Sequence, residues 1–503
     1  MNAIDRFLNT ITMYRLVVYY LGGLLALAAV FGAIGWLPYS PIAIVFSALF
    51  LTLVSWAANG IIAAFLKAHP NTESVYITAF ILALIITPVM PMNAAGILFL
   101  AWAAVLAMAS KYVFAIDKKH IFNPAAFGVA VTLLAFGEAA SWWAGGNLAL
   151  MAFVIAGGAL VVRKIQRFDL ALTFMAFALA SDVVTHAGFS PLMTIQDALV
   201  HTPLFFFASI MITEPLTTPP TRGLRLVYAA IVGALFSPFI AIGPLSLTPE
   251  LALLAGNVYS FAVSPKGKQT LILKEKKAMG GGIYDFVFKR EKGRRLRFRP
   301  GQYLEWTLAH AGVDTRGNRR YFTIASSPTE RDIHLGVKFY EPSSSFKKAL
   351  IAMRPGDTIV AGQLAGDFTL PRDPREKLAF IAGGIGITPF RSMVQYLIDR
   401  GERRDAVLFY SNRSDDEAAY RETFDAAERE IGLRTVYVTT GGGAKGNVAR
   451  LDAGTIRRTI PDYRERTFYL SGTHAMTNAF EKLLHDMGVP RSHVKTDFFP
   501  GFA

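Results

Sequence analysis

A short segment in the second half of the chain places a guanidinium, two aromatic rings and a hydroxyl in consecutive positions. Residues Arg320–Thr323 read Arg-Tyr-Phe-Thr, and Ser326–Pro328 follow shortly after them. A guanidinium fork matches the oxygens of a diphosphate, and an aromatic ring can pack against a flat heterocycle. A hydroxyl can hydrogen-bond to a ring nitrogen. Alone, such a strand would be ordinary sheet, but Pro300-Gly301-Gln302 before it and Ser326–Pro328 after it favour a functional role.

A glycine-rich turn follows some sixty residues later. Gly383–Pro389 reads GGIGITP; it comes after the apolar run Leu378–Ala382 and before the amphipathic stretch Phe390–Arg400. Glycines let backbone N–H groups approach a diphosphate closely. The spacing differs from the GxGxxG dinucleotide fingerprint. It predicts a strand, a turn and a helix that together bind a dinucleotide.

In order and spacing these motifs resemble the ferredoxin–NADP reductase superfamily. Arg299–Leu304 is similar to the family's Pro-Gly-Gln-(Tyr/Phe) strand, and Gly366–Phe368 to the segment that closes its barrel. The resemblance covers about residues 266–503, where short alternating apolar runs are typical of β-strands. It implies an antiparallel FAD-binding β-barrel over residues 266–373 and an α/β NAD(P)-binding domain over residues 374–503. The expected enzyme is an FAD-dependent NAD(P)H oxidoreductase.

The resemblance also implies roles for single residues. Arg320 would pair with the flavin diphosphate, Phe322 would pack on the ring or ribityl chain, and Thr323 would hydrogen-bond near flavin N5, where the hydride arrives. Thr323, Ser471, Asp497 and Phe499 are the candidate catalytic residues. Further cofactor-binding candidates are Tyr321, Val337, Ser344, Ser345, Gly383, Gly384, Gly386, Thr388, Pro389, Ser411, Arg413 and Gly472.

The choice between NADH and NADPH stays open at this point. Ser411 and Arg413 stand where a 2′-phosphate could be bound, whereas Asp415 and Asp416 would repel it. We prefer NADH. Two positions depart from the family pattern: Ser471 replaces the usual Cys, and Thr473 replaces the usual Pro.

The first half of the chain reads as membrane. Residues 1–265 carry 11 Lys/Arg and 9 Asp/Glu, against 40 and 28 in the remainder. Apolar runs of the length that crosses hydrocarbon as a helix recur about ten times, near residues 14–36, 42–66, 74–90, 93–113, 123–137, 148–162, 170–185, 197–213, 227–241 and 248–264. We therefore expect a polytopic α-helical membrane domain over residues 1–265.

Loop charges and an internal repeat give this domain an orientation. Lys and Arg occur only in alternate connections, which marks those connections as cytoplasmic. The protein should be a multi-pass protein of the inner membrane, with both termini and the reductase in the cytoplasm. Ile86–Pro91 and Ile212–Thr217 are similar and stand about five spans apart. An odd number of spans between the copies predicts an inverted repeat.

Two further segments resemble the flavin-bearing membrane subunits B of Nqr and D of Rnf. Asp117–Gly128 contains the family's His-Ile-Phe-Asn-Pro segment, and Glu214–Pro219 resembles its Asp-Pro segment with Glu in place of Asp. The similarity covers most of residues 40–262. The Ser/Thr-Gly-Ala-Thr motif that attaches FMN covalently is missing. The resemblance thus implies a non-covalent flavin or a quinone near Asn123, Glu214 and Thr217, although Asn123 before a proline could also simply cap a helix.

Composition excludes several classes of protein. The chain has no cysteine, which excludes disulfides, thiolate-held iron–sulfur clusters and Cys-ligated zinc, and we predict no metal site. The net charge of +14 sits on the second half and suits anionic lipid headgroups better than nucleic acid, because the basic residues are scattered. A haem-bearing membrane reductase is disfavoured, since no apolar run carries two histidines.

These observations predict a membrane-bound NAD(P)H:acceptor oxidoreductase. Electrons would pass from NAD(P)H through FAD to a flavin or quinone in the membrane half. One alternative is an ion or solute transporter with a regulatory reductase domain. Another is an anchored reductase that feeds a separate electron-accepting protein.

Overall fold

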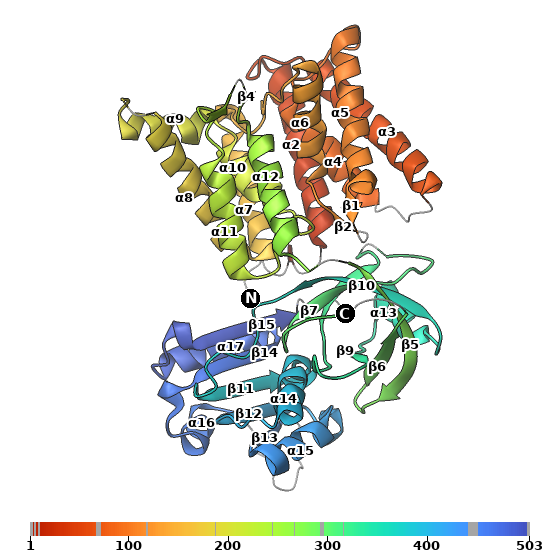
Figure 1. Ribbon diagram of the computed structural model, residues 1–503, viewed down its shortest axis with the longest axis vertical. Coiled ribbons are helices and arrows are strands. Elements are labelled where there is room, and N and C mark those ends of the chain that lie inside the picture. The colour runs from red at the N-terminus through yellow and green to blue at the C-terminus, as the bar shows by residue number, and fades with distance from the viewer. Residues whose placement is uncertain are drawn as a thin grey trace. The chain divides into compact units, whose positions relative to one another are not determined.

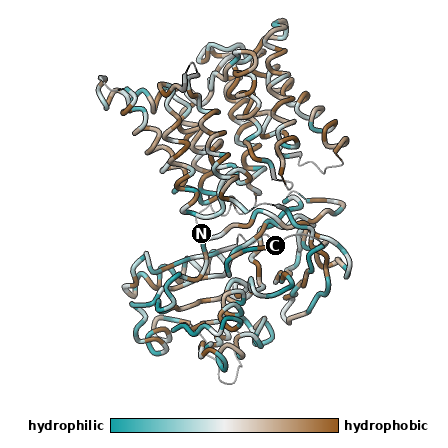
Figure 2. The backbone as a smooth tube through the Cα atoms, in the orientation of Figure 1, coloured by the Kyte–Doolittle hydropathy of each residue, from teal (hydrophilic) through white to brown (hydrophobic). Residues whose placement is uncertain are grey.

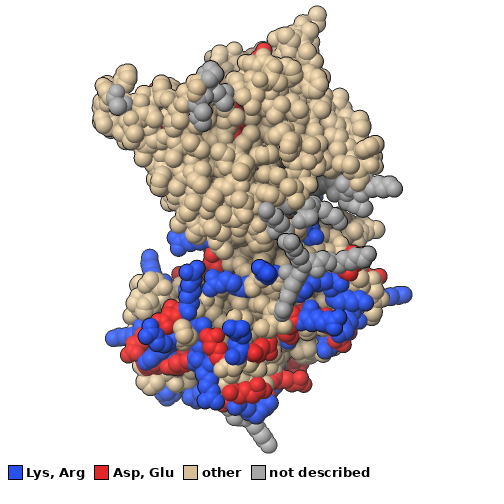
Figure 3. All heavy atoms as spheres, viewed as in Figure 1, with Lys and Arg blue, Asp and Glu red and all other residues tan. Residues whose placement is uncertain are grey.

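The structure, a computed structural model, divides the chain into two compact units: a first unit of Ile11–Gly267, and a second unit of Lys268–Ala503 together with Met1–Thr10. It describes residues 4, 7, 8, 11–66, 72–116, 119–186, 188–243, 245–265, 267–291, 296–314, 316–440 and 451–499. The hydropathy trace in Figure 2 is mostly apolar along the first unit and mixed along the second. Charged side chains cover the visible face of the second unit and are sparse on the first (Figure 3).

Five helices of the first unit are long and apolar enough to cross a membrane. They are α2 (Met13–Ala33), α3 (Pro41–Phe65), α5 (Ala94–Val113), α7 (Leu148–Ile165) and α8 (Phe168–Thr185). Large apolar side chains such as Trp56, Ile61 and Phe65 are exposed on them, as lipid-facing positions require.

The prediction of about ten spans is not met. The other apolar runs form shorter helices: α4 (Thr72–Ile85), α6 (Pro124–Phe136), α9 (Pro191–His201), α10 (Leu204–Phe206), the π-helix η1 (Phe207–Met211), α11 (Arg222–Ala234) and α12 (Pro249–Val263). A helix of 13 residues rises only about 20 Å, less than the roughly 30 Å of hydrocarbon. Prolines explain where several of these helices begin, because proline suits the first helical turn and not the interior.

The element order of the first unit repeats. The hairpin of β1 (Ala115–Ile116) and β2 (Lys119–His120) precedes α6, and the hairpin of β3 (Ala241–Ile242) and β4 (Leu245–Ser246) precedes α12. Both strands of the second hairpin start about 126 residues after their counterparts. The two hairpins lie at opposite ends of this unit in Figure 1. Such an arrangement is the one expected of inverted copies.

The second unit begins with an antiparallel half-barrel. Its strands are β5 (Gln269–Ala278), β6 (Ile283–Arg290), β7 (Tyr303–Thr307), β8 (Arg319–Thr323), β9 (Ile333–Lys338) and β10 (Thr358–Ala365), in the order β8-β7-β10-β5-β6-β9. Alternating residues such as Phe286, Phe288 and Trp306 fill its core together with Phe346 of α13 (Ser345–Ala352). Strand β8 is an edge of this sheet, so one side of it stays free of backbone pairing.

A parallel α/β sheet completes the second unit (Figure 1). Its strands are β11 (Leu378–Gly383), β12 (Ala406–Asn412), β13 (Arg434–Thr439), β14 (Thr467–Thr473) and β15 (Val494–Phe499), in the order β13-β12-β11-β14-β15. The helices are α14 (Thr388–Arg400), α15 (Arg421–Ile431), α16 (Ala453–Thr459) and α17 (His474–Asp486), with short 3₁₀ turns η2 (Gly384–Ile387), η3 (Asp415–Glu417), η4 (Tyr463–Glu465) and η5 (Arg491–His493). The chain runs outward from β11 to β13 and then returns to the other side of β11. Ligands of such sheets bind at the carboxyl ends of the strands where the order reverses, here β11 and β14.

The inverted arrangement can be tested with single cysteines, because the chain has none of its own. We expect Ile116→Cys and Gly243→Cys, both at exposed hairpin positions, to lie on opposite sides of the membrane. By the charge rule, a membrane-impermeant maleimide should label Gly243→Cys from the outside and Ile116→Cys only after permeabilisation. Labelling of both from the same side would contradict the inverted repeat.

Candidate functional site

Strand β8 presents the predicted flavin-binding residues on one face. Arg320 and Phe322 alternate along the strand and both meet Phe346 of α13: the Arg320 guanidinium lies 5.2 Å from the centre of that ring, and the two phenyl rings are 6.0 Å apart. Thr323 ends the strand and is 2% exposed. Its hydroxyl oxygen is buried and has no hydrogen-bond partner among the described residues. A cofactor that offers a polar atom at this position would satisfy it.

Arg320 is held by its own loop and keeps one buried nitrogen for another partner. Its Nη1 donates to the backbone carbonyls of Arg316, Gly317 and Arg319 at 2.7, 3.1 and 2.6 Å. Its Nη2 is buried without a partner in the described parts of the chain. Burial lowers the pKa of Arg320 to about 10, so the guanidinium stays charged at neutral pH. A buried cation in this state suits an anionic ligand.

A second cation, Lys347, stands in the first turn of α13. Burial, together with the Arg320 and Arg316 guanidinium groups, lowers the pKa of Lys347 to about 8. Its Nζ donates to the carbonyl of Lys338 at 2.9 Å. Sequence reasoning missed this residue, because a lysine inside a helix gives no signal of burial. Three cations at one helix N-terminus favour a diphosphate.

The serines at this helix start have capping roles. The Ser344 hydroxyl accepts from the Lys347 amide at 3.3 Å, and the Ser345 amide donates to Asp314 Oδ2 at 2.9 Å. Asp314 also pairs with Arg316. Both serines therefore shape the helix end, and their predicted contact with a diphosphate stays a prediction.

Two other predicted residues lie apart from this face. Tyr321 points to the opposite side of β8, is 42% exposed, and donates to Glu305 Oε2 at 3.0 Å. Successive residues of a strand face opposite ways, so Tyr321 faces away from Arg320 and Phe322, and its predicted role in cofactor binding stays a prediction. Val337 is 2% exposed and packs in the barrel core.

The glycines of the nicotinamide turn differ in what they permit. A Cβ at Gly386 would lie 2.4 Å from the carbonyl oxygen of Ser471, and one at Gly383 would lie 2.0 Å from Met476 Sδ. Gly472 is also confined by Met476. Gly384 has φ +52 and nothing within 4 Å of an added Cβ. Of these turn glycines Gly384 therefore opens onto space for a ligand, Gly386 is confined by the backbone of β14, and Gly383 is confined only by the flexible Met476 side chain.

Helix α14 starts directly after this turn, with Pro389 in its first turn and the Thr388 hydroxyl donating to the Ile385 carbonyl at 3.2 Å. The N-terminus of α14 therefore lies near the end of β11. The partial positive charge of a helix N-terminus favours an anionic diphosphate there. Ser411 and Arg413 lie at the carboxyl end of the neighbouring strand β12, with Arg413 exposed. Asp415 accepts from the Thr439 hydroxyl at 2.8 Å.

Ser471 and Asp497 are register partners on β14 and β15. The Ser471 hydroxyl and Asp497 Oδ2 are both buried without a hydrogen-bond partner in the regions that the structure describes. Burial raises the pKa of Asp497 to about 7, so this carboxyl can hold a proton at Oδ2 near neutral pH. The Phe499 side chain lies outside the described residues. Thr323, Ser471 and Asp497 are the polar groups expected beside a flavin and a nicotinamide.

The first unit also brings predicted residues together. Asn123 Nδ2 donates to Glu214 Oε2 at 3.0 Å, and the Thr217 hydroxyl donates to the same oxygen at 3.0 Å. Asn123 is 3% exposed. Its Oδ1 accepts from the Ala126 amide at 3.1 Å as the N-cap of α6. Asn123 therefore caps the helix and joins the acid at the same time.

His120 of the quoted motif also joins this polar cluster, whereas sequence reasoning missed Tyr228 and Asn257. His120 Nε2 lies 3.5 Å from Glu214 Oε1. Asn257 of α12 accepts from the Asn123 amide at 2.8 Å and donates to the Tyr228 hydroxyl at 3.2 Å. The motif in Asp117–Gly128 pointed to Asn123 as a site residue. Asn257 is a single Asn in the apolar helix α12, and no motif marks it.

Comparison with known proteins supports the predicted cofactor-binding character of the second unit. The family model described as "Oxidoreductase NAD-binding domain" matches residues 380–482. These residues form an NAD-binding domain. The C-terminal half is accordingly an FAD- and NAD(P)-binding reductase domain, an NAD(P)H oxidoreductase.

Relatives of the reductase share about a quarter of its residues. A flavohemoprotein of Halalkalibacterium halodurans is 25% identical over 245 residues, 46% of this chain and 59% of the relative. The stachydrine N-demethylase reductase subunit of Rhizobium meliloti is 26% identical over 233 residues, 44% of this chain and 64% of the relative. The chain thus spans less than two thirds of these curated relatives.

Among solved structures, the flavohem-like FAD/NAD-binding domain of a Vibrio cholerae nitric oxide dioxygenase is similar with a TM-score of 0.42, 19% identity and coverage of 46% of this chain and 98% of that one. A Neisseria gonorrhoeae ferredoxin–NADP⁺ reductase with bound FAD and NADP has a TM-score of 0.39, 17% identity and coverage of 46% and 97%. The resemblance of the first unit to Nqr and Rnf subunits gains no support from these comparisons and stays a prediction.

The cation cluster around α13 makes FAD affinity depend on pH. A bound diphosphate would raise the pKa of Lys347 from about 8, so binding takes up a proton once the pH exceeds that value. The affinity of the FAD-free protein for FAD should therefore fall as the pH rises through 8. Equilibrium titration at pH 7 and pH 9 measures this. The dependence should be much weaker in Lys347→Gln and unchanged in Lys348→Gln, whose side chain is exposed. Equal pH dependence in both variants would remove Lys347 from the site.

The glycine turn can be tested at the residue that faces open space. Gly384→Ala should fold at a backbone cost of about 1–2 kcal/mol and bind NAD(P)H at least about tenfold more weakly, or ~1.4 kcal/mol. Gly401→Ala is the matched control, because Gly401 also has positive φ and open space but lies at the far end of α14. Gly386→Ala should instead lower the melting temperature. Equal NAD(P)H affinities of Gly384→Ala and Gly401→Ala would place the dinucleotide elsewhere.

Proposed function

We propose that the protein is a membrane-bound NAD(P)H:acceptor oxidoreductase that passes electrons from NAD(P)H through FAD to a non-covalent flavin or a quinone in its first unit. NAD(P)H gives up a hydride and becomes NAD(P)⁺, and both electrons finally reduce the membrane acceptor. Bound FAD accepts two electrons together and can release them one at a time. Arg320 and Lys347 would hold its diphosphate, and Thr323 would bond its ring.

The observation that carries the membrane part of the proposal is the hydrogen bond between Asn123 and Glu214. It joins two segments that are 91 residues apart, one from each copy of the repeat, in a mostly buried cluster. Buried polar side chains are costly among apolar helices and mark functional sites in membrane domains. An amide, a carboxylate and an imidazole together offer donors and acceptors that suit the polar edge of a flavin or quinone.

The relatives' names show that such reductase domains serve different acceptors. One is called a flavohemoprotein and another a demethylase reductase subunit. In this chain the first unit is the natural candidate for the acceptor, because it is covalently joined to the reductase and holds a buried polar cluster. We expect it in the inner membrane, with the reductase in the cytoplasm.

A transporter is the second candidate, favoured by the repeated element order and the interrupted helices α10 and η1. In that case the reductase would regulate movement of an ion or solute. Extraction and mass analysis of cofactors separate the candidates: electron transfer requires a second flavin or a quinone besides FAD, and a transporter does not.

The acceptor site can be separated from the helix cap by choice of substitution. Asn123→Ser keeps a good N-cap residue but is too short to reach Glu214; Asn123→Leu removes both contacts. Both substitutions should leave the rate of FAD reduction by NAD(P)H unchanged. Both should slow the reoxidation of FAD by the membrane acceptor at least about tenfold, because a hydrogen bond to a charged group contributes about 1.5–3 kcal/mol. Stopped-flow absorbance measures both half-reactions.

Reoxidation of Asn123→Ser at the wild-type rate would reduce Asn123 to a helix cap. If the protein band still shows flavin fluorescence after denaturing gel electrophoresis, the flavin is covalently attached and the non-covalent assignment is wrong.

A further inference from the structure

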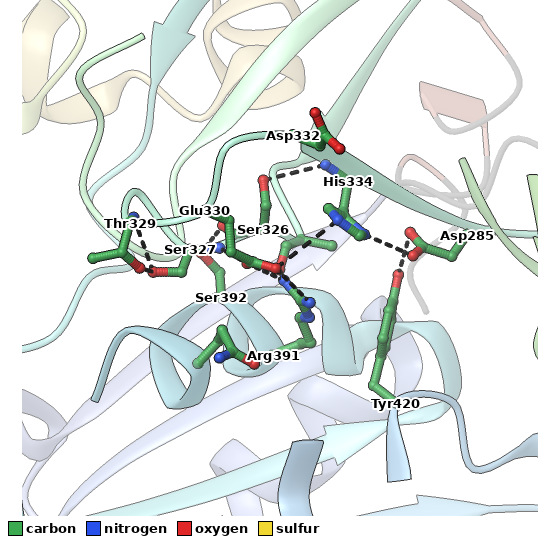
Figure 4. Close-up of polar contacts among 12 residues, drawn as sticks. Asp285, Ser326, Ser327, Thr329, Glu330, Asp332, His334, Arg391, Ser392 and Tyr420 are labelled. Atoms are coloured by element: carbon green, nitrogen blue, oxygen red, sulfur yellow. Dashed lines mark hydrogen bonds and ion pairs between the residues drawn. The ribbon is translucent and has the colours of Figure 1, made fainter. Parts of the chain in front are cut away.

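A buried charged contact ties the nicotinamide-binding helix to the flavin-binding barrel. Arg391, in the first turn of α14, donates with both Nη atoms to the two carboxylate oxygens of Glu330, with Nη2 at 2.8 Å from Oε1 (Figure 4). Arg391 is 7% exposed and the Glu330 side chain 22%. Such a fork fixes direction as well as distance. Neither residue belongs to the motifs found in the sequence.

The same contact fixes the segment that leaves the flavin strand. Arg391 Nη1 also donates to the carbonyl of Ala325 at 3.1 Å, two residues after Thr323. The hydroxyl of Ser392 donates to the carbonyl of Ser326 at 2.6 Å. Glu330 accepts from the amide of Ser327. Ala325 and Ser326 are therefore bound directly to the start of α14, and Ser327 is bound to it through Glu330.

A second set of polar contacts, the Tyr420–Asp285–His334 arm, also reaches Glu330. The Tyr420 hydroxyl, before α15, donates to Asp285 Oδ1 at 2.9 Å, and His334 Nδ1 lies 2.8 Å from Asp285 Oδ2. His334 Nε2 lies 3.9 Å from Glu330 Oε1. Figure 4 shows these side chains converging between β9 and α14. Asp285 and Tyr420 are 3% and 6% exposed.

A glycine of β9 lets this arm close against the nicotinamide turn. A Cβ at Gly336 would lie 2.7 Å from the Tyr420 hydroxyl and 2.8 Å from Thr388 Cγ2. Thr388 begins α14, next to the predicted diphosphate site. The Arg391–Glu330 pair and the Tyr420–Asp285–His334 arm thus both reach the first turn of α14, within three residues of Thr388.

Stability alone does not explain such a contact. Apolar residues of similar size would often serve as well as a buried ion pair, since both charges lose water. An ion pair with a forked geometry specifies one arrangement of the two elements. The two elements in question carry Thr323 and the glycine turn, between which a hydride must move. Displacement of reacting groups by 1 Å can cost about 10²-fold in rate.

We propose that Arg391 and Glu330 are positioning residues that set the spacing between the nicotinamide turn and the flavin strand, supported by the Tyr420–Asp285–His334 arm. The proposal rests on the reductase function proposed above. Neither residue contacts the reacting atoms. They act by holding residues 325–327 and the first turn of α14 in one register.

The test uses Glu330→Gln, which keeps the shape and removes the charge, and Arg391→Lys, which keeps the charge and removes the fork. In the full-length, FAD-loaded protein the limiting rate of FAD reduction by NADH should fall about 10–100-fold, as expected for a small displacement. The apparent Kd for NADH should change less than about threefold, because diphosphate contacts remain. The kinetic isotope effect with 4-deuterated NADH should rise. Ser392→Ala, which loses one hydrogen bond, should show a smaller change in the same direction.

Hydrogen exchange of the FAD-free protein gives a readout independent of turnover. Amides of residues 325–327 and 385–392 should exchange faster in Glu330→Gln, while those of β12 should not. Glu465→Gln is the control, since its exposed ion pair with Lys377 lies outside this contact. It should match wild type in every measurement.

Wild-type rates and isotope effects in FAD-loaded Glu330→Gln and Arg391→Lys would overturn the proposal. A lower melting temperature with unchanged hydride transfer would likewise overturn it, because the pair would then be only structural. Failure of NADH or NADPH to reduce the wild-type flavin would instead contradict the proposed function.

Discussion

The reductase site depends on the close approach of Gly386 to the backbone of Ser471. The turn after β11 can lie against β14 only because no Cβ intervenes. That approach places the carboxyl ends of the two strands side by side at the point where the sheet order reverses. Ser471 and the N-terminus of α14 then face the same region. Every later feature of the nicotinamide site, including the open position at Gly384, follows from this contact.

The distribution of charged side chains also differs between two parts of the reductase. Around α13, Arg316, Arg320 and Lys347 outnumber their carboxylate partner Asp314, so this end of the helix favours a ligand with two negative charges. Between β9 and α14 the balance is different, because the positive charge of Arg391 is matched by the carboxylate of Glu330 through both Nη atoms. An unbalanced cluster is suited to binding, and a balanced buried pair is suited to holding position. In the proposed reductase, the first arrangement would bind the flavin and the second would position the nicotinamide turn for hydride transfer.

The sequence predicts the reductase well where function demands local patterns. The strand of Arg320 and Thr323, the glycine turn and the proline-started helix all lie within a few residues of their expected places. Contacts between distant residues leave no such pattern: Glu330 and Arg391 are 61 residues apart, and Asp285 and Tyr420 are 135 apart. A motif also lists residues without saying on which side of the strand each one lies, so the opposite orientation of Tyr321 appears only in the structure.

The first unit shows the corresponding limit for helices. Hydropathy reveals apolar runs but not where hydrogen bonding changes, so the run near 197–213 is in fact α9, α10 and the π-helix η1. Short and interrupted helices leave backbone and polar side chains inside the unit, which lipid alone cannot satisfy. Asn123 illustrates the solution: one amide caps α6, and the same side chain bonds Glu214 from the other copy of the repeat. A cap needs no carboxylate partner, and a buried carboxylate is costly. The retention of both at one point between the copies therefore argues for a ligand-binding role there beyond the making of a helix end.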